Sequence, residues 1–299
     1  MSEPRNHHYV SQTLSQNFLS EGGKLFKYDK IENRITVVKS TKRLFSRRDL
    51  NSRINKNGEV DHKSVENELS RNFETDFPRH CENILNALNI ECEIREMVPN
   101  TENIHASMEY LIAMALIGPS RHPQHIREKE VAIFGTLIEI AKNAMPELQK
   151  SIYSELSRLS GVTNKVPVDF KDLSEGMLKL MGEIKYGVMR APENHYFILP
   201  DCSAGTKRFQ MPSDFINGKE YLNPSMPIGF ALMPINSKTV ITAVSRGVLP
   251  EEFREQANGF YTINEETLFG YNNILFDSAY QEVVCENREY LEGFIKQID

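Results

Sequence analysis

Four polar residues, spread along the chain, have side chains suited to acid–base or metal chemistry. His8 stands in a polar N-terminal segment, and a histidine can act as a general base near neutral pH. Asp201 follows an apolar run at a predicted strand end, where a carboxylate can serve as an acid–base group or a metal ligand. Asn272 and Asn273 interrupt an apolar helical segment, a position that disfavours asparagine. We predict that His8 and Asp201 lie close together, with Asn272 or Asn273 beside them.

Each of these residues also has a structural interpretation. His8 can anchor the N-terminal segment through a hydrogen bond, and Asp201 can cap the strand exit through a side-chain turn. A buried asparagine at 272 or 273 can satisfy a backbone group across the core. In the catalytic interpretation the expected cofactor is Mg²⁺ with Asp201 as its ligand, because Mg²⁺ needs only one or two carboxylates when substrate phosphates complete its coordination.

The basic residues concentrate in one part of the chain. Residues 1–60 contain 12 Lys/Arg and 6 Asp/Glu, whereas the remaining residues contain 23 and 35. Four cations at the centre of this excess could neutralise nucleic-acid phosphates, namely Lys42, Arg43, Arg47 and Arg48. The alternative is a solvated charged segment without a ligand. A second group could also meet phosphate, although a solvated loop between helices explains it more simply; it consists of Arg121, His122, His125 and Arg127.

Several functional classes are disfavoured. The chain has no P-loop, GxGxxG, HExxH or GxSxG motif, and its four cysteines include no CxxC pair. The most apolar run, 110–117, is much shorter than the roughly 20 residues that a membrane span needs. The first residues lack the apolar centre of a signal peptide. We therefore expect a cytoplasmic protein with reduced thiols and no membrane partner.

The elements that must position these residues follow from hydrophobic periodicity. Two β-prone runs, 24–28 and 34–38, flank a turn-forming segment and predict a β-hairpin. Further elements are expected as helices at 64–88, 103–117, 128–144, 148–159 and 173–189, strands at 195–199, 228–233 and 239–245, and a helical tail at 265–298. This grouping favours one α+β domain spanning 1–299, helix-rich with a small antiparallel sheet. We expect that sheet to combine 24–39, 195–200 and 228–245.

A series of short motifs runs along nearly the whole chain. It comprises His8-Tyr9-Val10-Ser11-Gln12, Asn17-Phe18, Gly23-Lys24-Leu25, Tyr28-Asp29-Lys30, Leu111-Ile112-Ala113, Phe197-Ile198 with Asp201, the stretch 226–242, and Asn272 or Asn273 with Ala279 and Val283. In this order the set resembles the bacterial family called domain of unknown function 4238. The resemblance implies that His8, Asp201 and the asparagines are motif residues, and it implies no particular reaction.

The chain departs from the family pattern at several motif positions. Ser11 stands where the family has proline, Leu199-Pro200 replaces Thr-Ser, and Cys202-Ser203 replaces Asn-Pro. The middle helix lacks the family's Gln and Arg in register, with Arg121 only nearby. If those positions carry chemistry in the family, this member is altered or inactive.

Two functions of different classes are expected. The first is a phosphodiester hydrolase, a nuclease acting in bacterial conflict or phage defence, motivated by the basic segment, His8 and Asp201. The alternative is a non-catalytic sensor or adaptor that binds nucleic acid or a partner protein. A pocket shared by His8 and Asp201 would favour the enzyme, because acid–base partners must reach one substrate.

Overall fold

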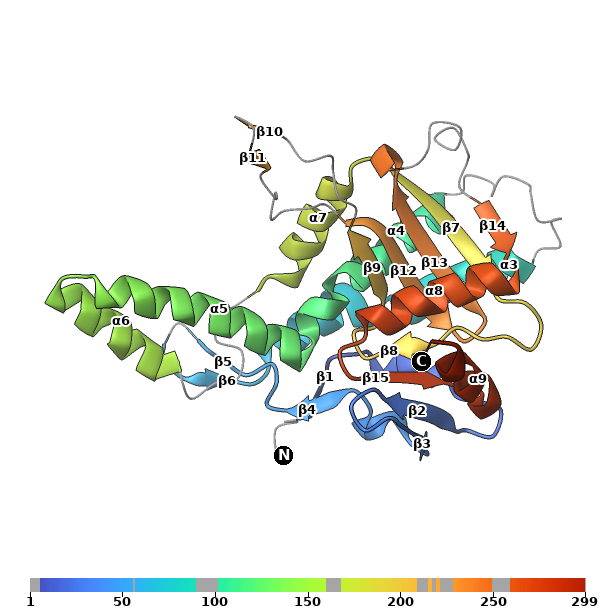
Figure 1. The fold of residues 1–299 in the computed structure, drawn as a ribbon, viewed down its shortest axis with the longest axis horizontal. Coiled ribbons are helices and arrows are strands. Elements are labelled where there is room, and N and C mark those ends of the chain that lie inside the picture. The colour runs from blue at the N-terminus through green and yellow to red at the C-terminus, as the bar shows by residue number, and fades with distance from the viewer. Residues whose placement is uncertain are drawn as a thin grey trace.

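The computed structural model describes residues 6–55, 57–89, 102–159, 168–208, 215–216, 219–220, 228–248 and 259–298. Within them, short strands come first, most helices occupy the middle, and strands and two further helices follow (Figure 1). The sheets are predominantly antiparallel, so the α+β prediction is confirmed. No helix in the described part of the chain combines the length and apolar character required to cross a membrane.

The larger sheet has five strands. Their order is β14 (Gly259–Thr262), β7 (Ile184–Arg190), β13 (Thr239–Ser245), β12 (Ile228–Asn236) and β9 (Gly205–Arg208). All neighbours are antiparallel except β14 and β7. The expected strands at 228–233 and 239–245 are confirmed as β12 and β13, a pair rich in β-branched residues that a short turn joins.

The second sheet has four antiparallel strands and contains the predicted hairpin. Its order is β3 (Arg34–Val38), β2 (Leu25–Asp29), β15 (Glu282–Cys285) and β8 (Leu199–Pro200). The prediction of one sheet was therefore wrong in part, because the hairpin joins β8 whereas β12 and β13 belong to the other sheet. Three short strand pairs complete the strands, namely β1 (Asn6–His8) with β4 (Ser46–Arg48), β5 (Arg53–Ile54) with β6 (Val60–Asp61), and β10 (Phe215–Ile216) with β11 (Lys219–Glu220).

The helices pack on both sheets. They are α1 (Gln12–Gln16), α2 (Ser64–Leu69), α3 (Phe77–Asn89), α4 (Glu102–Arg121), α5 (Pro123–Lys142), α6 (Pro146–Leu159), α7 (Phe170–Met181), α8 (Glu265–Ser278) and α9 (Arg288–Ile298). Helices α4 and α7 contact the five-stranded sheet, α9 contacts β2, and α8 touches β9 and β8, one strand from each sheet. The pair α5–α6 extends away from the sheets as an arm (Figure 1).

Two segments predicted as helix form strands instead. The helix expected at 173–189 ends at Met181, followed by Gly182 with φ of 71°, and Ile184–Arg190 continues as β7. The expected helical tail is interrupted by β15. Both strands lie between two neighbours in a sheet, so their pairing outweighs local helix preference. The strand expected at 195–199 pairs only at Leu199–Pro200.

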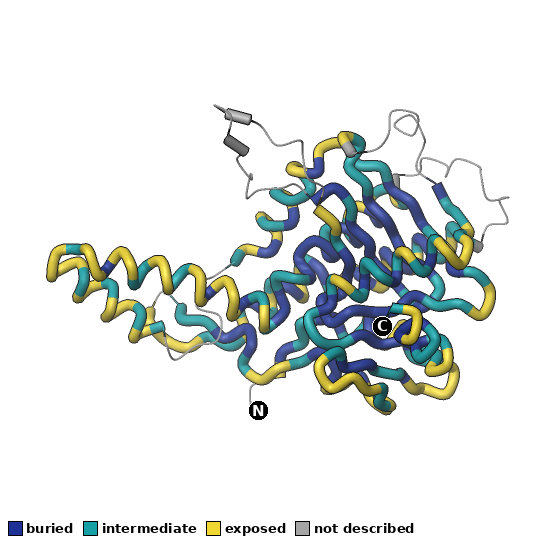
Figure 2. The backbone as a smooth tube through the Cα atoms, viewed as in Figure 1, coloured by how far each residue is buried: buried dark blue, intermediate teal, exposed yellow. Residues whose placement is uncertain are grey.

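Two clusters of buried apolar residues form the core. One joins the N-terminal segment, α3, α4 and the five-stranded sheet around residues such as Leu14, Leu111 and Ile241. The other lies between α8, α9 and the four-stranded sheet around residues such as Leu275 and Val283. The buried, dark segments of the backbone concentrate in the sheets and the helices beside them, whereas the arm is mostly exposed (Figure 2). Residues near 196–201 and 279–284 therefore pack where the two sheets meet.

Candidate functional site

Asp201 lies in the turn that follows β8, and its carboxylate is almost completely buried. Oδ1 accepts the backbone N–H of Tyr280 at 2.9 Å, and Oδ2 accepts those of Gln281 at 2.8 Å and Glu282 at 2.9 Å. Only 1% of the residue is exposed. The side chain therefore joins the β8 turn to the segment that enters β15. Asp201 thus has a structural role, but not the expected local turn at the strand exit, because its three donors belong to residues 280–282.

His122 lies against this carboxylate. Its Nε2 is 3.4 Å from Oδ2 of Asp201, and its Nδ1 accepts the backbone N–H of Gln124, which caps the first turn of α5. The hydrogen-bond pattern therefore assigns the proton of a neutral imidazole to Nε2, facing Asp201. The ring stacks on Tyr280 at 4.2 Å between centroids and meets the edge of Tyr9 at 5.0 Å. Asp201 and His122 thus form a buried carboxylate–imidazole pair.

The N-terminal segment that carries His8 docks onto the body of the protein. β1 pairs with β4. Nη2 of Arg121 donates a hydrogen bond to the backbone carbonyl of His8 at 3.0 Å and another to the carboxylate of Glu74. Nδ1 of His7 accepts the backbone N–H of Asn51 at 2.9 Å. Nε2 of His8 is buried without a hydrogen bond to any described residue. The docking of this segment thus depends on its backbone, on His7 and on Arg121.

Asn272 is buried and its amide is fully used inside the fold. Oδ1 accepts the N–H of Ile198 at 3.1 Å, and Nδ2 donates to the carbonyl of Tyr196 and to the hydroxyl of Tyr290, both at 2.9 Å. Asn273 is half-buried and makes no side-chain hydrogen bond with the described residues. Asn272 therefore fastens α8 to the segment before β8 and to α9, as its structural interpretation predicts.

The structure brings the predicted residues into one region without joining them in one constellation. Within the described residues, no hydrogen bond or ion pair links the side chains of His8, Asp201 and Asn272. The connection from the N-terminal segment to Asp201 runs through Tyr9 and His122. The described part of the chain contains no cluster of three His, Cys, Asp or Glu side chains suited to a metal ion. Mg²⁺ ligation by Asp201 stays a prediction.

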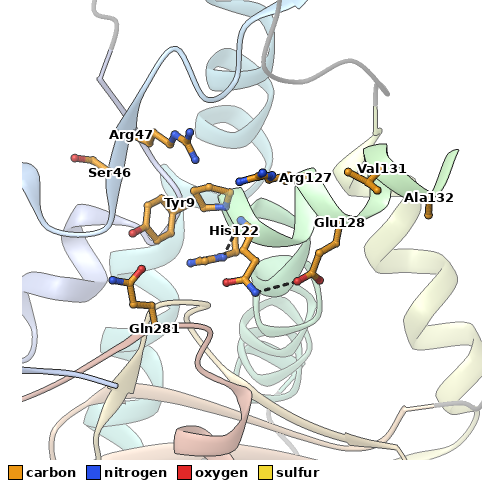
Figure 3. A pocket seen from close by; sticks show the side chains of 11 residues that line it. Tyr9, Ser46, Arg47, His122, Arg127, Glu128, Val131, Ala132 and Gln281 are labelled. Atoms are coloured by element: carbon orange, nitrogen blue, oxygen red, sulfur yellow. Dashed lines mark hydrogen bonds between the residues drawn. The ribbon is translucent and has the colours of Figure 1, made fainter. Parts of the chain in front are cut away.

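A cavity of about 770 Å³ opens beside the carboxylate–imidazole pair. Its polar lining includes Tyr9 after β1, Arg47 from β4, His122 and Arg127 from the start of α5, and Gln281 before β15 (Figure 3). Four segments that are distant in the sequence therefore meet at this cavity. We call this set of five residues the arginine pocket.

Only one of the four predicted basic residues lines this pocket. Arg47 lines it, whereas Lys42, Arg43 and Arg48 are exposed residues outside its lining. Arg48 lies 3.5 Å from a carboxylate oxygen of Asp49. Of the four cations expected to bind nucleic acid, Arg47 alone therefore lines this cavity.

The lining of this cavity carries two cationic side chains, Arg47 and Arg127, and one carboxylate, that of Glu128. Arg47 and Arg127 are both exposed, and neither forms an ion pair with the described residues. Burial raises the pKa of the Tyr9 hydroxyl, and the nearby Glu282 and Asp201 raise it further, whereas Arg47 opposes them. Tyr9 therefore remains protonated at neutral pH and can donate a hydrogen bond. The partial positive charge at the N-terminus of the 20-residue helix α5 adds to the field.

α5 begins earlier in the chain than the sequence predicts. The helix was expected from 128, but it begins at Pro123. The available signal was His122-Pro123, since proline is favoured at the first helical position after a capping residue. An earlier helix start places Gln124, Arg127 and Glu128 on one face, at spacings of three and four residues. Gln281 had no recognisable sequence signal.

A family model described as "Protein of unknown function (DUF4238)" matches residues 6–289. This span covers the N-terminal segment, the arginine pocket, both sheets and α8. Neither the curated proteins nor the solved structures include a significant match to the chain.

Proposed function

The chain belongs to the DUF4238 family, and we propose that it binds a phosphate-bearing ligand in the arginine pocket. The ligand class is a nucleotide or one end of a nucleic-acid strand. This proposal corresponds to the binding alternative expected from the sequence, with the arginine pocket as the proposed site. The roles in bacterial conflict and phage defence stay predictions.

The proposal rests on one observation: Arg47 and Arg127 line the same cavity and neither forms an ion pair with the described residues, although the carboxylate of Glu128 also belongs to the lining. A guanidinium presents several N–H donors in a plane and can bind two phosphate oxygens at once. Two such groups would repel each other in an empty pocket and would be stabilised by a bound dianion. The hydroxyl of Tyr9 supplies a further donor, and the partial positive charge at the N-terminus of α5 adds to the attraction.

The size and the apolar part of the cavity limit the ligand. A volume of about 770 Å³ lies within the range of roughly 300–1,000 Å³ typical of small-molecule sites. It suits one nucleotide better than a duplex, which needs a long groove. The lining also includes Tyr9, Pro123, Val131 and Ala132, whose apolar surfaces can contact a base or a sugar. A phosphate at the arginines with a base on this wall is the expected arrangement.

A second candidate function is hydrolysis of the bound phosphodiester. The observation that favours it is His122, which lines the cavity and is held by Asp201. An imidazole fixed by a carboxylate is an arrangement used in general acid–base catalysis. His122 would have to release the N–H of Gln124 before its Nδ1 could accept a proton, and that bond is 3.2 Å long. Binding alone requires no such rearrangement, so we rank it first.

The test is a binding measurement by fluorescence anisotropy with labelled single-stranded DNA and RNA, and by calorimetry with inorganic phosphate and nucleoside monophosphates. Arg47→Ala and Arg127→Ala should each weaken binding by about 10- to 150-fold, since a hydrogen bond to a charged group contributes roughly 1.5–3 kcal/mol. Arg48→Ala and Lys129→Ala are the matched controls, because both residues are exposed cations outside the pocket lining. Their effect should stay within about 3-fold under moderate salt.

Two results would contradict phosphate binding at this pocket. One is the absence of binding by all probes at low salt. The other is an equal loss of binding affinity for Arg47→Ala and Arg48→Ala, which would indicate general attraction to a basic surface.

The same samples, incubated with and without Mg²⁺ and separated on a denaturing gel, test hydrolysis. Cleavage that disappears in His122→Ala while binding persists would raise the hydrolase to first place.

A further inference from the structure

The arm formed by α5 and α6 has more apolar surface than two helices can cover. α6 contains no buried residue, and α5 buries only Ile126, Glu130 and Ala141. Along the outer part of the arm, large apolar side chains face solvent. Those exposed by half or more are Ile140 at 51%, Met145 at 74% and Leu148 at 50%. The arm stands apart from both sheets, and the exposed surface continues around its tip (Figure 2).

The apolar residues of α5 form two adjacent stripes. Helical spacing places Phe134, Ile138 and Ala141 on one stripe and Ile133, Leu137 and Ile140 on the next. At about 100° per residue these stripes together span roughly 180° of the helix surface. One neighbouring helix covers an arc of only about 100°. Ala141 is buried beside α6, where Gln149 donates to its carbonyl, whereas Ile140 remains half exposed. Ile133 and Leu137 are partly buried, so the described chain covers the stripe that contains Ile140 only in part.

The charges of the arm identify the kind of partner. α5 and α6 together carry five cationic side chains and five carboxylates, whereas the whole chain has a formal net charge of −6. Both signs alternate along the helices and include pairs such as Lys142 with Glu139 and Arg158 with Glu155. A neutral surface of alternating charge is complementary to itself under two-fold symmetry, because each charged row can face its opposite. A strongly acidic or basic partner has no such match.

We infer that the α5–α6 arm pairs with the same arm of a second copy of this chain. Two antiparallel hairpins then form a four-helix bundle, in which the Ile140 stripe of each copy is buried against its partner. Helices of 20 and 14 residues, about 30 and 21 Å long, provide several turns of contact. The Ile140 stripe contains no residue of the arginine pocket, so the inference does not depend on the proposed function.

The test is sedimentation velocity of the full-length protein over a wide concentration range. The wild type should be dimeric, and Ile140→Glu and Leu148→Glu should each raise the dimer dissociation constant at least about 10-fold, since each buries a carboxylate in an apolar contact. Both sites are half exposed in the single chain, so the variants should fold, which far-UV circular dichroism checks. Ile31→Glu is the matched control: Ile31 is 75% exposed in the β2–β3 turn, and dimerisation should be unchanged.

The inference is overturned if the wild type remains monomeric up to its solubility limit. It is also overturned if a dimer persists with unchanged affinity in both arm variants, because the interface would then lie elsewhere. Equal weakening by Ile31→Glu would mean that any added charge disperses the protein, and this result also excludes a specific arm contact.

Discussion

Replacing Asp201 by asparagine should destabilise the protein strongly if the side chain is a structural fastening. The carboxylate accepts three backbone N–H groups and is 1% exposed. An amide offers one oxygen and directs its own N–H groups at the remaining donors. Each buried donor left unpaired costs about 1–3 kcal/mol, and the charge-assisted bonds are the stronger ones. We expect a total loss of about 3–6 kcal/mol in the free energy of unfolding.

The corresponding shift in melting temperature follows from the chain length. Unfolding entropy near the midpoint is about 2.1 cal/mol/K per residue, or roughly 0.6 kcal/mol/K for 299 residues. One kcal/mol then corresponds to about 1.6 °C, so Asp201→Asn should lower Tm by about 5–10 °C. Thermal unfolding followed by far-UV circular dichroism measures this shift. The control is Asp277→Asn, an exposed carboxylate on α8 that makes no hydrogen bond with the described residues, and it should change Tm by less than about 1 °C.

The outcome separates the two interpretations of Asp201. A large loss of stability identifies the side chain as a fastening between the β8 turn and β15. An unchanged Tm for Asp201→Asn would refute the hydrogen-bond argument, because a buried acceptor of three backbone donors cannot be removed without cost. If activity is found and disappears at unchanged Tm, the catalytic interpretation of Asp201 is right instead.

Three other substitutions test the packing around this region by the same thermal assay. Asn272→Ala should cost about 3 kcal/mol by stranding buried backbone groups, whereas Asn273→Ala should stay within about 0.5 kcal/mol; equal effects would contradict the assignment. Gly118→Ala should cost at least about 1–3 kcal/mol, because its Cβ would lie 2.1 Å from the carbonyl oxygen of Cys202, while Gly135→Ala, with open space around it, should stabilise α5 by about 0.5–1 kcal/mol. Burial raises the pKa of Asp29, but hydrogen bonds from the N–H groups of Glu32 and Ile31 lower it more. Because the pKa is lower in the folded than in the unfolded chain, the ionised side chain stabilises the fold at pH values above the unfolded-state pKa. The loss of stability caused by Asp29→Asn should therefore be full at pH 7 and shrink below about pH 4, and a loss that does not change with pH would disprove this linkage.

The local pattern of the sequence determined those elements whose residues carry their own signal. The β2–β3 hairpin follows from two β-prone runs around a turn, β13 follows from its β-branched residues, and β12 follows from a short apolar run. Most helices follow from apolar spacing, although their ends moved, as at Pro123. The α+β class followed from the order of these elements, because that order is a property of the chain itself.

The tertiary structure decided everything that depends on partners distant in the chain. β7 and β15 became strands because neighbours complete their hydrogen bonds, and no local window contains those neighbours. Arg47 and Arg127 became one pocket because β4 and the start of α5 meet in space. The donors that hold Asp201 are backbone N–H groups of residues 280–282, and every residue type except proline presents the same N–H. A contact made by the backbone leaves no side-chain pattern in the sequence, so only the folded chain reveals it.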